Sequence, residues 1–160
     1  MRGYNRLLVA FYVITDALLG MASLLVAYWL RFKTGLIPVT KGYPPIDQYL
    51  QMLPFLAVLV PLAFHIQGLY RLRRGRSRVD DFFAVLVGSV LAAILGLVAL
   101  LYYQAYYLAN EAILSGTYHE ASRVVLVLFL FVNVVFTYGS REMVREALER
   151  RWKAGIGLKR

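Results

Sequence analysis

Residues 7 to 30 read LLVAFYVITDALLGMASLLVAYWL, a run in which Asp16 is the only charged side chain. A helix rises about 1.5 Å per residue, so this run would be roughly 36 Å long and could cross the ~30 Å hydrocarbon core of a bilayer with some tilt. A secretory signal peptide has a shorter apolar region of about 7 to 15 residues, followed by a cleavage site of small residues. Here the run ends in aromatic and basic residues instead. We expect Tyr28, Trp29 and Phe32 to form part of an aromatic belt at the membrane interface.

Three further apolar runs follow, at residues 49–70, 82–103 and 121–138. The first of these contains two prolines, which membrane helices tolerate because neighbouring groups satisfy the freed carbonyls. A kink is expected near Pro61. The second carries no charged side chain, and the third is the shortest. The four runs predict an all-α integral membrane protein in which residues 1–160 form one membrane domain, a four-transmembrane-helix bundle.

The composition supports a membrane protein. The chain is 60% hydrophobic and 17% charged, whereas soluble domains carry about 25% charged residues. A net charge of +9 would suit nucleic acid if the basic residues covered a polar surface. They lie instead in clusters outside the apolar runs, so no nucleic-acid partner is expected. The chain has no Cys and two His, and we expect neither a metal site nor a cofactor.

The densest positive charge lies between the second and third runs, in the segment 71–78, which we call the arginine loop. It contains Arg71, Arg73, Arg74, Arg76 and Arg78. Two more basic residues precede the first run and seven follow Tyr138, so 14 of the 18 Lys and Arg residues would share one side of the membrane. Positive charge collects on the cytoplasmic side. The pattern therefore predicts that both termini are cytoplasmic.

The arginine loop has two interpretations. It can set the topology and attract anionic headgroups, at about 1 kcal/mol per residue near the surface. It can also make a specific contact with a lipid phosphate or a docked domain, because guanidinium groups bind phosphate with two parallel hydrogen bonds. The first interpretation is favoured by the loop's position and by the acidic residues Asp80 and Asp81, which suit the first turn of the next helix.

Each apolar run carries one polar residue at a similar depth from its cytoplasmic end, which suggests an intramembrane polar cluster inside the bundle. The four residues are Asp16, His65, Ser89 and Asn133. Hydrogen bonding between helices is the favoured role, and in that case Asp16→Asn should be tolerated. A site that touches a lipid phosphate and a path for protons or ions are the alternatives.

The third run carries small residues at every fourth position, which would lie on one stripe of a helix: Ala84, Gly88, Ala92 and Gly96. Such spacing allows two helix backbones to approach closely. The partner is either another helix of the bundle, which we slightly favour, or a second copy of the chain in a homodimer.

Residues 139–154 carry apolar side chains at helical spacing among many charges, which predicts a cytoplasmic extension of the last membrane helix. Gly155 then ends this stalk helix. Motifs that would carry catalysis are incomplete. HEASR, from His119, lacks the second His of a zinc helix, and GIG, from Gly155, follows no strand. We therefore expect no catalytic residue and no enzymatic activity from this chain.

Three segments together resemble a known family: DALLGMASLLVAYWLRF, GLYRLRRGRSRVDDF, and the final stretch from SRVVLVLFLFVNVVFTYGSREM onward. They are similar to the N-terminal membrane module of bacterial polyprenyl glycosylphosphotransferases, which transfer a sugar 1-phosphate from a nucleotide sugar to undecaprenyl phosphate. In that family a Rossmann-like domain and a catalytic domain follow the four-helix module. GLKR, at the end of this sequence, corresponds to the entry into the Rossmann-like domain, and the catalytic domain is absent.

The resemblance implies a multi-pass protein of the bacterial inner membrane, acting as the anchor and assembly module of a transferase that initiates exopolysaccharide or O-antigen synthesis. Its expected partners are membrane lipids, among them polyprenyl phosphate near the arginine loop, and a catalytic domain or partner enzyme. Two other functions remain open. The chain could anchor a nucleotide-sugar dehydratase of polysaccharide synthesis, because similar leaders precede those enzymes, or it could be a small transporter or scaffold that uses the Asp16 cluster.

Overall fold

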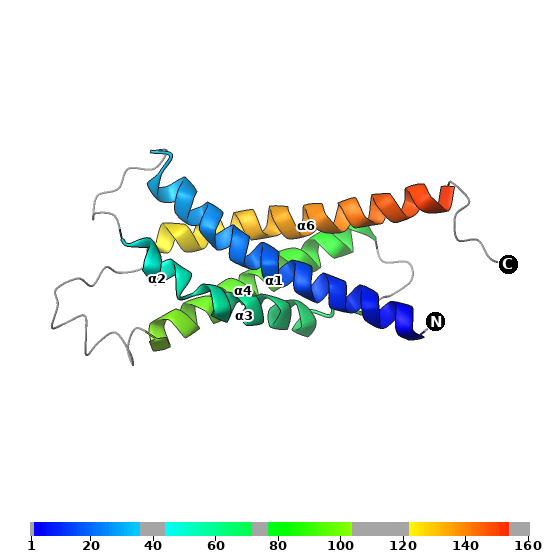
Figure 1. Ribbon diagram of the computed structural model, residues 1–160, viewed down its shortest axis with the longest axis horizontal. Coiled ribbons are helices and arrows are strands. Elements are labelled where there is room, and N and C mark those ends of the chain that lie inside the picture. Colours follow the sequence, from blue (N-terminus) through cyan, green and yellow to red (C-terminus); the bar gives the residue numbers. More distant parts are fainter. Residues whose placement is uncertain (1, 36–43, 72–76, 104–121, 154–160) are drawn as a thin grey trace.

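The structure, a computed structural model, describes residues 2–35, 44–71, 77–103 and 122–153. This part of the chain is helical and contains no strand (Figure 1). Its helices are α1 (Arg2–Phe32), α2 (Ile46–Leu50), α3 (Leu53–Ile66), α4 (Arg78–Tyr103) and α6 (Arg123–Lys153). They provide four segments long and apolar enough to cross a bilayer, with α2 and α3 together making the second. The predicted all-α bundle of four transmembrane helices is confirmed.

The second span differs most from its predicted bounds. Its helix is interrupted at Gln51 and Met52 and ends at Ile66 instead of Tyr70. The helix continues through Pro61, the ninth residue of α3, as membrane helices can when neighbouring groups satisfy the carbonyl that an interior proline frees. The first and third spans are longer than predicted, since α1 and α4 both begin several residues before their apolar runs.

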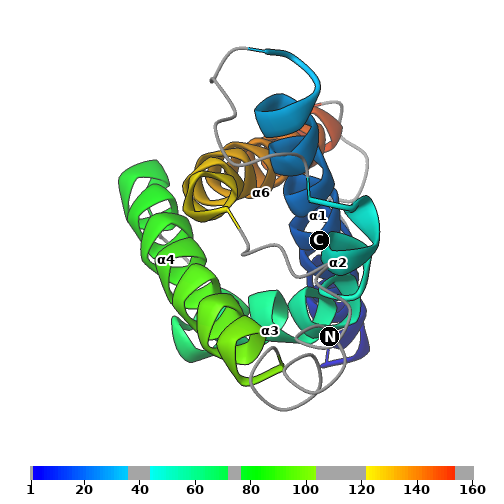
Figure 2. The same ribbon diagram turned by 90° about the vertical axis from the view of Figure 1, so that its left-hand side faces the viewer.

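The four long helices form a ring in which each packs on two neighbours (Figure 2). α1 contacts α6 and α3, and α4 contacts α3 and α6. The start of α1 and the end of α6 lie at one end of the bundle, together with the end of α3 and the start of α4 (Figure 1). The two ends of the arginine loop, Arg71 and Arg78, are therefore at the same end of the bundle as the start of α1 and the end of α6.

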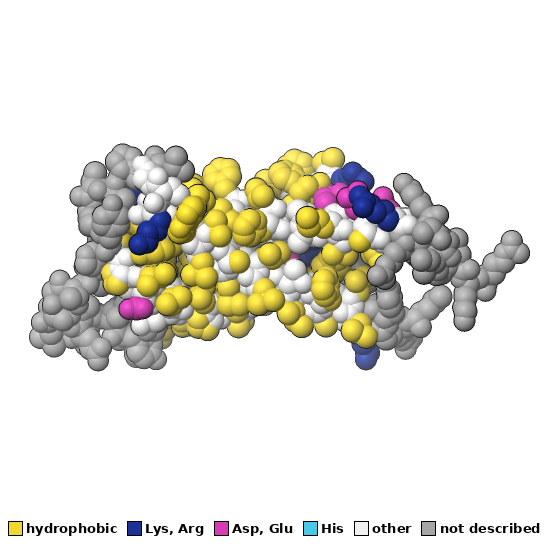
Figure 3. Space-filling model, turned by 45° about the horizontal axis from the view of Figure 1, so that its top comes forward, with side chains coloured by type: hydrophobic (Ala, Val, Ile, Leu, Met, Phe, Trp, Pro, Cys, Tyr) yellow, Lys and Arg dark blue, Asp and Glu magenta, His cyan; other side chains and the backbone are white. Residues whose placement is uncertain are grey.

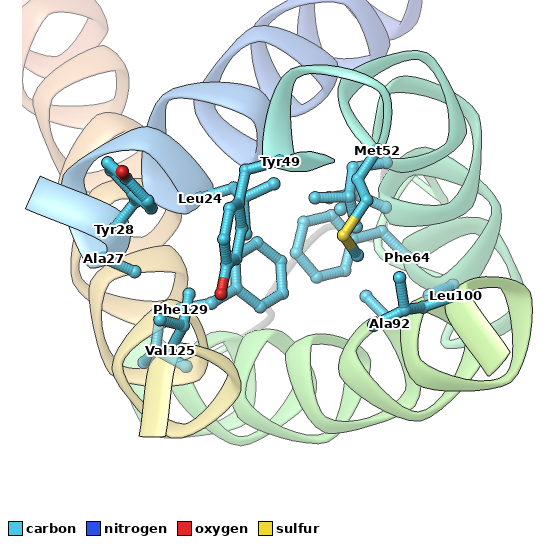
Figure 4. Close-up of a cluster of buried hydrophobic side chains, with 14 of the residues drawn as sticks. Leu24, Ala27, Tyr28, Tyr49, Met52, Phe64, Ala92, Leu100, Val125 and Phe129 are labelled. Carbon is cyan, nitrogen blue, oxygen red and sulfur yellow. The ribbon is translucent and has the colours of Figure 1, made fainter. Parts of the chain in front are cut away.

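Apolar side chains cover the middle of the bundle and also fill its interior. The face in Figure 3 shows a hydrophobic surface between charged side chains at the two ends. Inside, Leu24, Val60, Phe64 and Phe129 are at most 1% exposed, and the close-up of this core shows residues of all four spans converging (Figure 4). Apolar surface on both sides of a helix is what a lipid solvent permits.

The small-residue stripe of α4 packs against α3. A Cβ atom added to Gly88 would lie 2.5 Å from Cδ1 of Phe64, and one added to Gly96 would lie 3.3 Å from Cδ2 of Leu56. Ala92, between them, is fully buried, while Ala84 is partly buried against the core. The stripe is thus covered within one chain, and it does not provide the surface for a homodimer.

The expected aromatic belt is only partly present. Tyr28 and Phe32 are 8% and 7% exposed, and both pack against the ring of Tyr49 at the start of the second span. The Tyr28 hydroxyl donates a hydrogen bond to the carbonyl of Pro44 (3.1 Å). Trp29 is 57% exposed, as an interfacial aromatic residue would be. The prediction for Tyr28 and Phe32 is therefore wrong, because these rings close the end of the core.

Candidate functional site: a buried ion pair at the base of the stalk

Asp16 in α1 forms an ion pair with Arg141 in α6. Nη2 of Arg141 lies 2.7 Å from Oδ2 of Asp16, and the two side chains are 14% and 1% exposed. Arg141 follows the apolar part of α6 by three residues, and helical side chains point back toward the N-terminus of their helix. The guanidinium group therefore reaches into the bundle from the base of the stalk. Arg141 thus provides the counter-charge that a carboxylate needs when it is buried in an apolar helix.

Tyr70 reaches the same carboxylate because of the way α3 ends. Gly68 adopts a φ of +70°, and the amide of Leu69 bonds to the carbonyl of Phe64 (3.0 Å), a Schellman motif that reverses the chain. The reversal turns Tyr70 inward, where its hydroxyl donates to Oδ2 of Asp16 (2.9 Å). Burial raises the pKa of the Tyr70 phenol, and the charge of Asp16 raises it further. The hydroxyl thus remains a protonated donor.

Aromatic rings enclose the Arg141 guanidinium. Its Cζ lies 5.0 Å from the ring centroid of Tyr12, 5.9 Å from that of Tyr70 and 6.0 Å from that of Phe64. Rings at this distance attract a cation, and a planar guanidinium stacks on them in a way that a lysine ammonium does not. α6 is therefore fixed to α1 and to the end of α3 through one arginine.

The structure divides the predicted polar cluster into parts. Nδ2 of Asn133 in α6 donates to Oγ of Ser89 in α4 at 2.9 Å, and both residues are fully buried. Asp16 is held by Arg141 and Tyr70 instead. His65 is exposed on the outside of the bundle, so its place in the cluster was predicted wrongly. The prediction used only the position of each residue along its helix, and this position does not determine which face of the helix a residue occupies.

Ser89→Ala should lower the stability of the bundle by about 0.6 kcal/mol, the mean contribution of a hydrogen bond between membrane helices. The Asn133 amide would lose its acceptor in a buried position. Reversible unfolding in mixed micelles would measure the change. Ser140→Ala is the matched control, because that hydroxyl bonds only to a carbonyl of its own helix, Thr137 O at 2.9 Å. Equal effects of the two substitutions would contradict the assignment.

The stalk is also tied to the start of α4. Ser77 and Asp80 form a capping box there, in which the Asp80 amide donates to Oγ of Ser77 (3.0 Å). Beside it Arg78 lies 3.7 Å from Glu142, and Asp81 lies 3.6 Å from Arg145. Such partly exposed pairs contribute about 0 to 1 kcal/mol each, so they orient the stalk more than they stabilise it.

The arginine loop is described only at its edges. Arg71 is exposed, and Arg78 is engaged with Glu142. Arg73, Arg74 and Arg76 lie outside the described residues, so the predicted phosphate or docking contacts remain predictions. Within the described ranges no group of three or more His, Cys, Asp or Glu side chains could hold a metal ion.

Fold and site together define the class: a multi-pass helical membrane protein whose last span continues as a charged helix and is fixed at its base by a buried ion pair. Comparison with known proteins finds no significant match to a family model, to a curated protein or to a solved structure.

Proposed function

We propose that the chain is the non-catalytic membrane anchor and assembly module of a polyprenyl-phosphate sugar-1-phosphate transferase that initiates exopolysaccharide or O-antigen synthesis. The observation that carries the proposal is the continuity of α6. One helix runs from Arg123 to Lys153, and eight of its last 13 residues are charged. A helix that leaves the apolar band without a break would hold an attached domain in a fixed orientation relative to the bundle. A continuous helix of this kind suits the attachment of an enzyme that works at a membrane surface.

Buried contacts hold the base of the stalk helix in place, which supports an assembly role. Arg141 is bound to Asp16 and packed between rings, and Glu142 and Arg145 contact the start of α4. Rotation of the stalk about its axis would break the buried pair, at a cost of several kcal/mol. The module would therefore hold a catalytic domain in one orientation relative to the bilayer.

The proposed orientation places both termini and the arginine loop in the cytoplasm of a bacterium. The ends of the described helices at that side carry basic segments that favour the cytoplasmic face. The loop would then lie at the inner leaflet, where its guanidinium groups attract anionic headgroups, the phosphate of polyprenyl phosphate among them.

Reconstitution in lipid nanodiscs tests the proposal. The chain would be combined with a separately purified catalytic domain of this transferase class, undecaprenyl phosphate and a panel of labelled nucleotide sugars. We expect no label in the lipid fraction from the chain alone, and more lipid-linked label when the domain is added than the domain gives in empty nanodiscs. No gain over empty nanodiscs would overturn the proposal, and so would transfer by the chain alone. A gain only with a dehydratase domain, seen as water-soluble keto sugar nucleotide, would favour the dehydratase anchor.

Substitution in the arginine loop is expected to weaken lipid binding. Replacing Arg73, Arg74 and Arg76 with Gln should lower the preference for anionic over zwitterionic lipid by up to about 3 kcal/mol, at about 1 kcal/mol per charge. Native mass spectrometry of the lipids retained by the purified protein would measure it. The same three positions changed to Lys provide the control. If Lys preserves the preference, general attraction is sufficient, whereas loss with Lys indicates guanidinium recognition of phosphate. An unchanged preference in the Gln variant would contradict the assignment.

A further inference from the structure

The inner face of α6 carries a stripe of polar residues that the anchoring function does not use. Asn133, Thr137 and Arg141 are spaced four residues apart, so they lie one above another along the helix at intervals of about 6 Å. Asn133 and Thr137 are fully buried. Ser89 of α4 contacts one end of the stripe and Asp16 of α1 contacts the other. The stripe therefore lies between three spans of the bundle.

Several polar atoms of this stripe lack hydrogen-bond partners among the described residues. In α6 they are Oδ1 of Asn133, Oγ1 of Thr137 and Nε of Arg141. In α1, Oδ1 of Asp16 also has no partner, while Oδ2 of the same carboxylate is bonded to Arg141. Leaving a buried polar atom unsatisfied costs about 1 to 3 kcal/mol, and more when it is charged. Native proteins accept this cost rarely, and they satisfy such atoms with bound water when protein groups do not reach them.

The chemistry of the unpaired atoms identifies the ligand. Two of them accept hydrogen bonds, the Nε–H group of Arg141 donates, and the Thr137 hydroxyl does both. The charges of Asp16 and Arg141 cancel, so an added cation would be repelled by the guanidinium and an added anion by the carboxylate. A small neutral molecule that donates and accepts fits this set. We propose that the stripe is a buried water-binding site shared by α1, α4 and α6.

The geometry of the ion pair fits this site. Arg141 and Asp16 are joined through one atom of each group, Nη2 and Oδ2 at 2.7 Å. The second atoms, Nε and Oδ1, belong to the same planar groups, so one water molecule can bridge them. Water beside Thr137 then extends the hydrogen-bond network from Tyr70 and Asp16 toward the Ser89–Asn133 pair. Polar groups on three spans become one network through water.

Nuclear magnetic resonance of the wild-type chain in deuterated lipid bilayers tests the site directly. Magnetisation would be transferred from water protons to the side chains of Thr137 and Asn133. We expect transfer to both residues. Val135, on the same helix but 65% exposed toward lipid, provides the matched negative control and should receive none. Absence of transfer to Thr137 and Asn133 would overturn the proposal.

An isosteric substitution provides a second test. Thr137→Val removes the hydroxyl without changing the shape, and it should reduce the folding equilibrium constant about tenfold because the bound water loses a partner. Ser23→Ala is the control, since the buried Ser23 hydroxyl is satisfied within its own helix by Leu19 O at 2.7 Å. Such a local bond adds little to helix stability, so Ser23→Ala should change the constant less than Thr137→Val does. A dry interior would leave Thr137→Val as stable as wild type or more so, which would overturn the proposal.

Discussion

Replacing Asp16 with alanine is expected to destabilise the bundle by about 3 to 5 kcal/mol, the largest loss for any single side chain at the site. The substitution leaves the Arg141 guanidinium without its counter-charge while its side chain is 14% exposed. Removing one partner of a buried pair costs this much because the remaining charge cannot recover its hydration. Equilibrium unfolding in mixed micelles would measure the loss.

A double-mutant cycle separates the pair from other effects of the substitution. Asp16→Leu combined with Arg141→Met removes both charges and keeps apolar volume, so the double variant should recover most of the stability lost by either single variant. Asp47→Ala is the control carboxylate, because Asp47 is exposed at the start of α2, and it should cost less than about 1 kcal/mol. Strictly additive losses in the cycle would show that Asp16 and Arg141 do not interact.

The ion pair also changes the expectation for Asp16→Asn. Hydrogen bonding between helices alone would make this substitution tolerable, because asparagine still offers an acceptor to Tyr70. The structure adds a charge that asparagine cannot neutralise. We now expect Asp16→Asn to lie between wild type and Asp16→Ala in stability.

The fold could be predicted from the sequence because a membrane imposes simple rules. Length and apolar composition identify the four spans, and the position of charge divides the loops between two sides. These rules do not depend on side-chain packing. The predicted end of the second span was wrong because a single residue sets it. Gly68 adopts a positive φ, and the helix ends at Ile66, four residues before the end of the apolar run at Tyr70.

The site was predicted only in part, because its partners come from segments that the sequence assigns to other roles. Asp16 is conspicuous as a lone carboxylate in an apolar run. Arg141 was counted among the basic residues that set topology, and Tyr70 was placed at the end of a span. One signal was available, since Asn133, Thr137 and Arg141 share a four-residue spacing that continues the polar face past the apolar run. Periodicity across that boundary would have identified Arg141.

Gly88→Val is expected to destabilise the bundle by about 3 kcal/mol, because it places bulk at a close contact between α3 and α4. Even a Cβ atom at Gly88 would lie 2.5 Å from Cδ1 and 2.9 Å from Cε1 of Phe64. Phe64 is fully buried and also contacts the Arg141 guanidinium, so its ring cannot move without disturbing the ion pair. Overpacking of a close-packed interior typically costs about 1 to 3 kcal/mol, and a branched side chain belongs at the upper end.

Gly139→Ala is the matched control, because beyond the adjacent residues and the backbone of α6 itself no atom lies within 4 Å of the Cβ position at Gly139. Alanine there should be neutral or should stabilise the helix by up to about 1 kcal/mol. Phe64→Leu in the Gly88→Val background should restore part of the lost stability by vacating the space that the valine needs. If Gly88→Val were as stable as Gly139→Ala, α3 and α4 would not pack as closely as the structure indicates, and the small-residue stripe would be free to serve another surface.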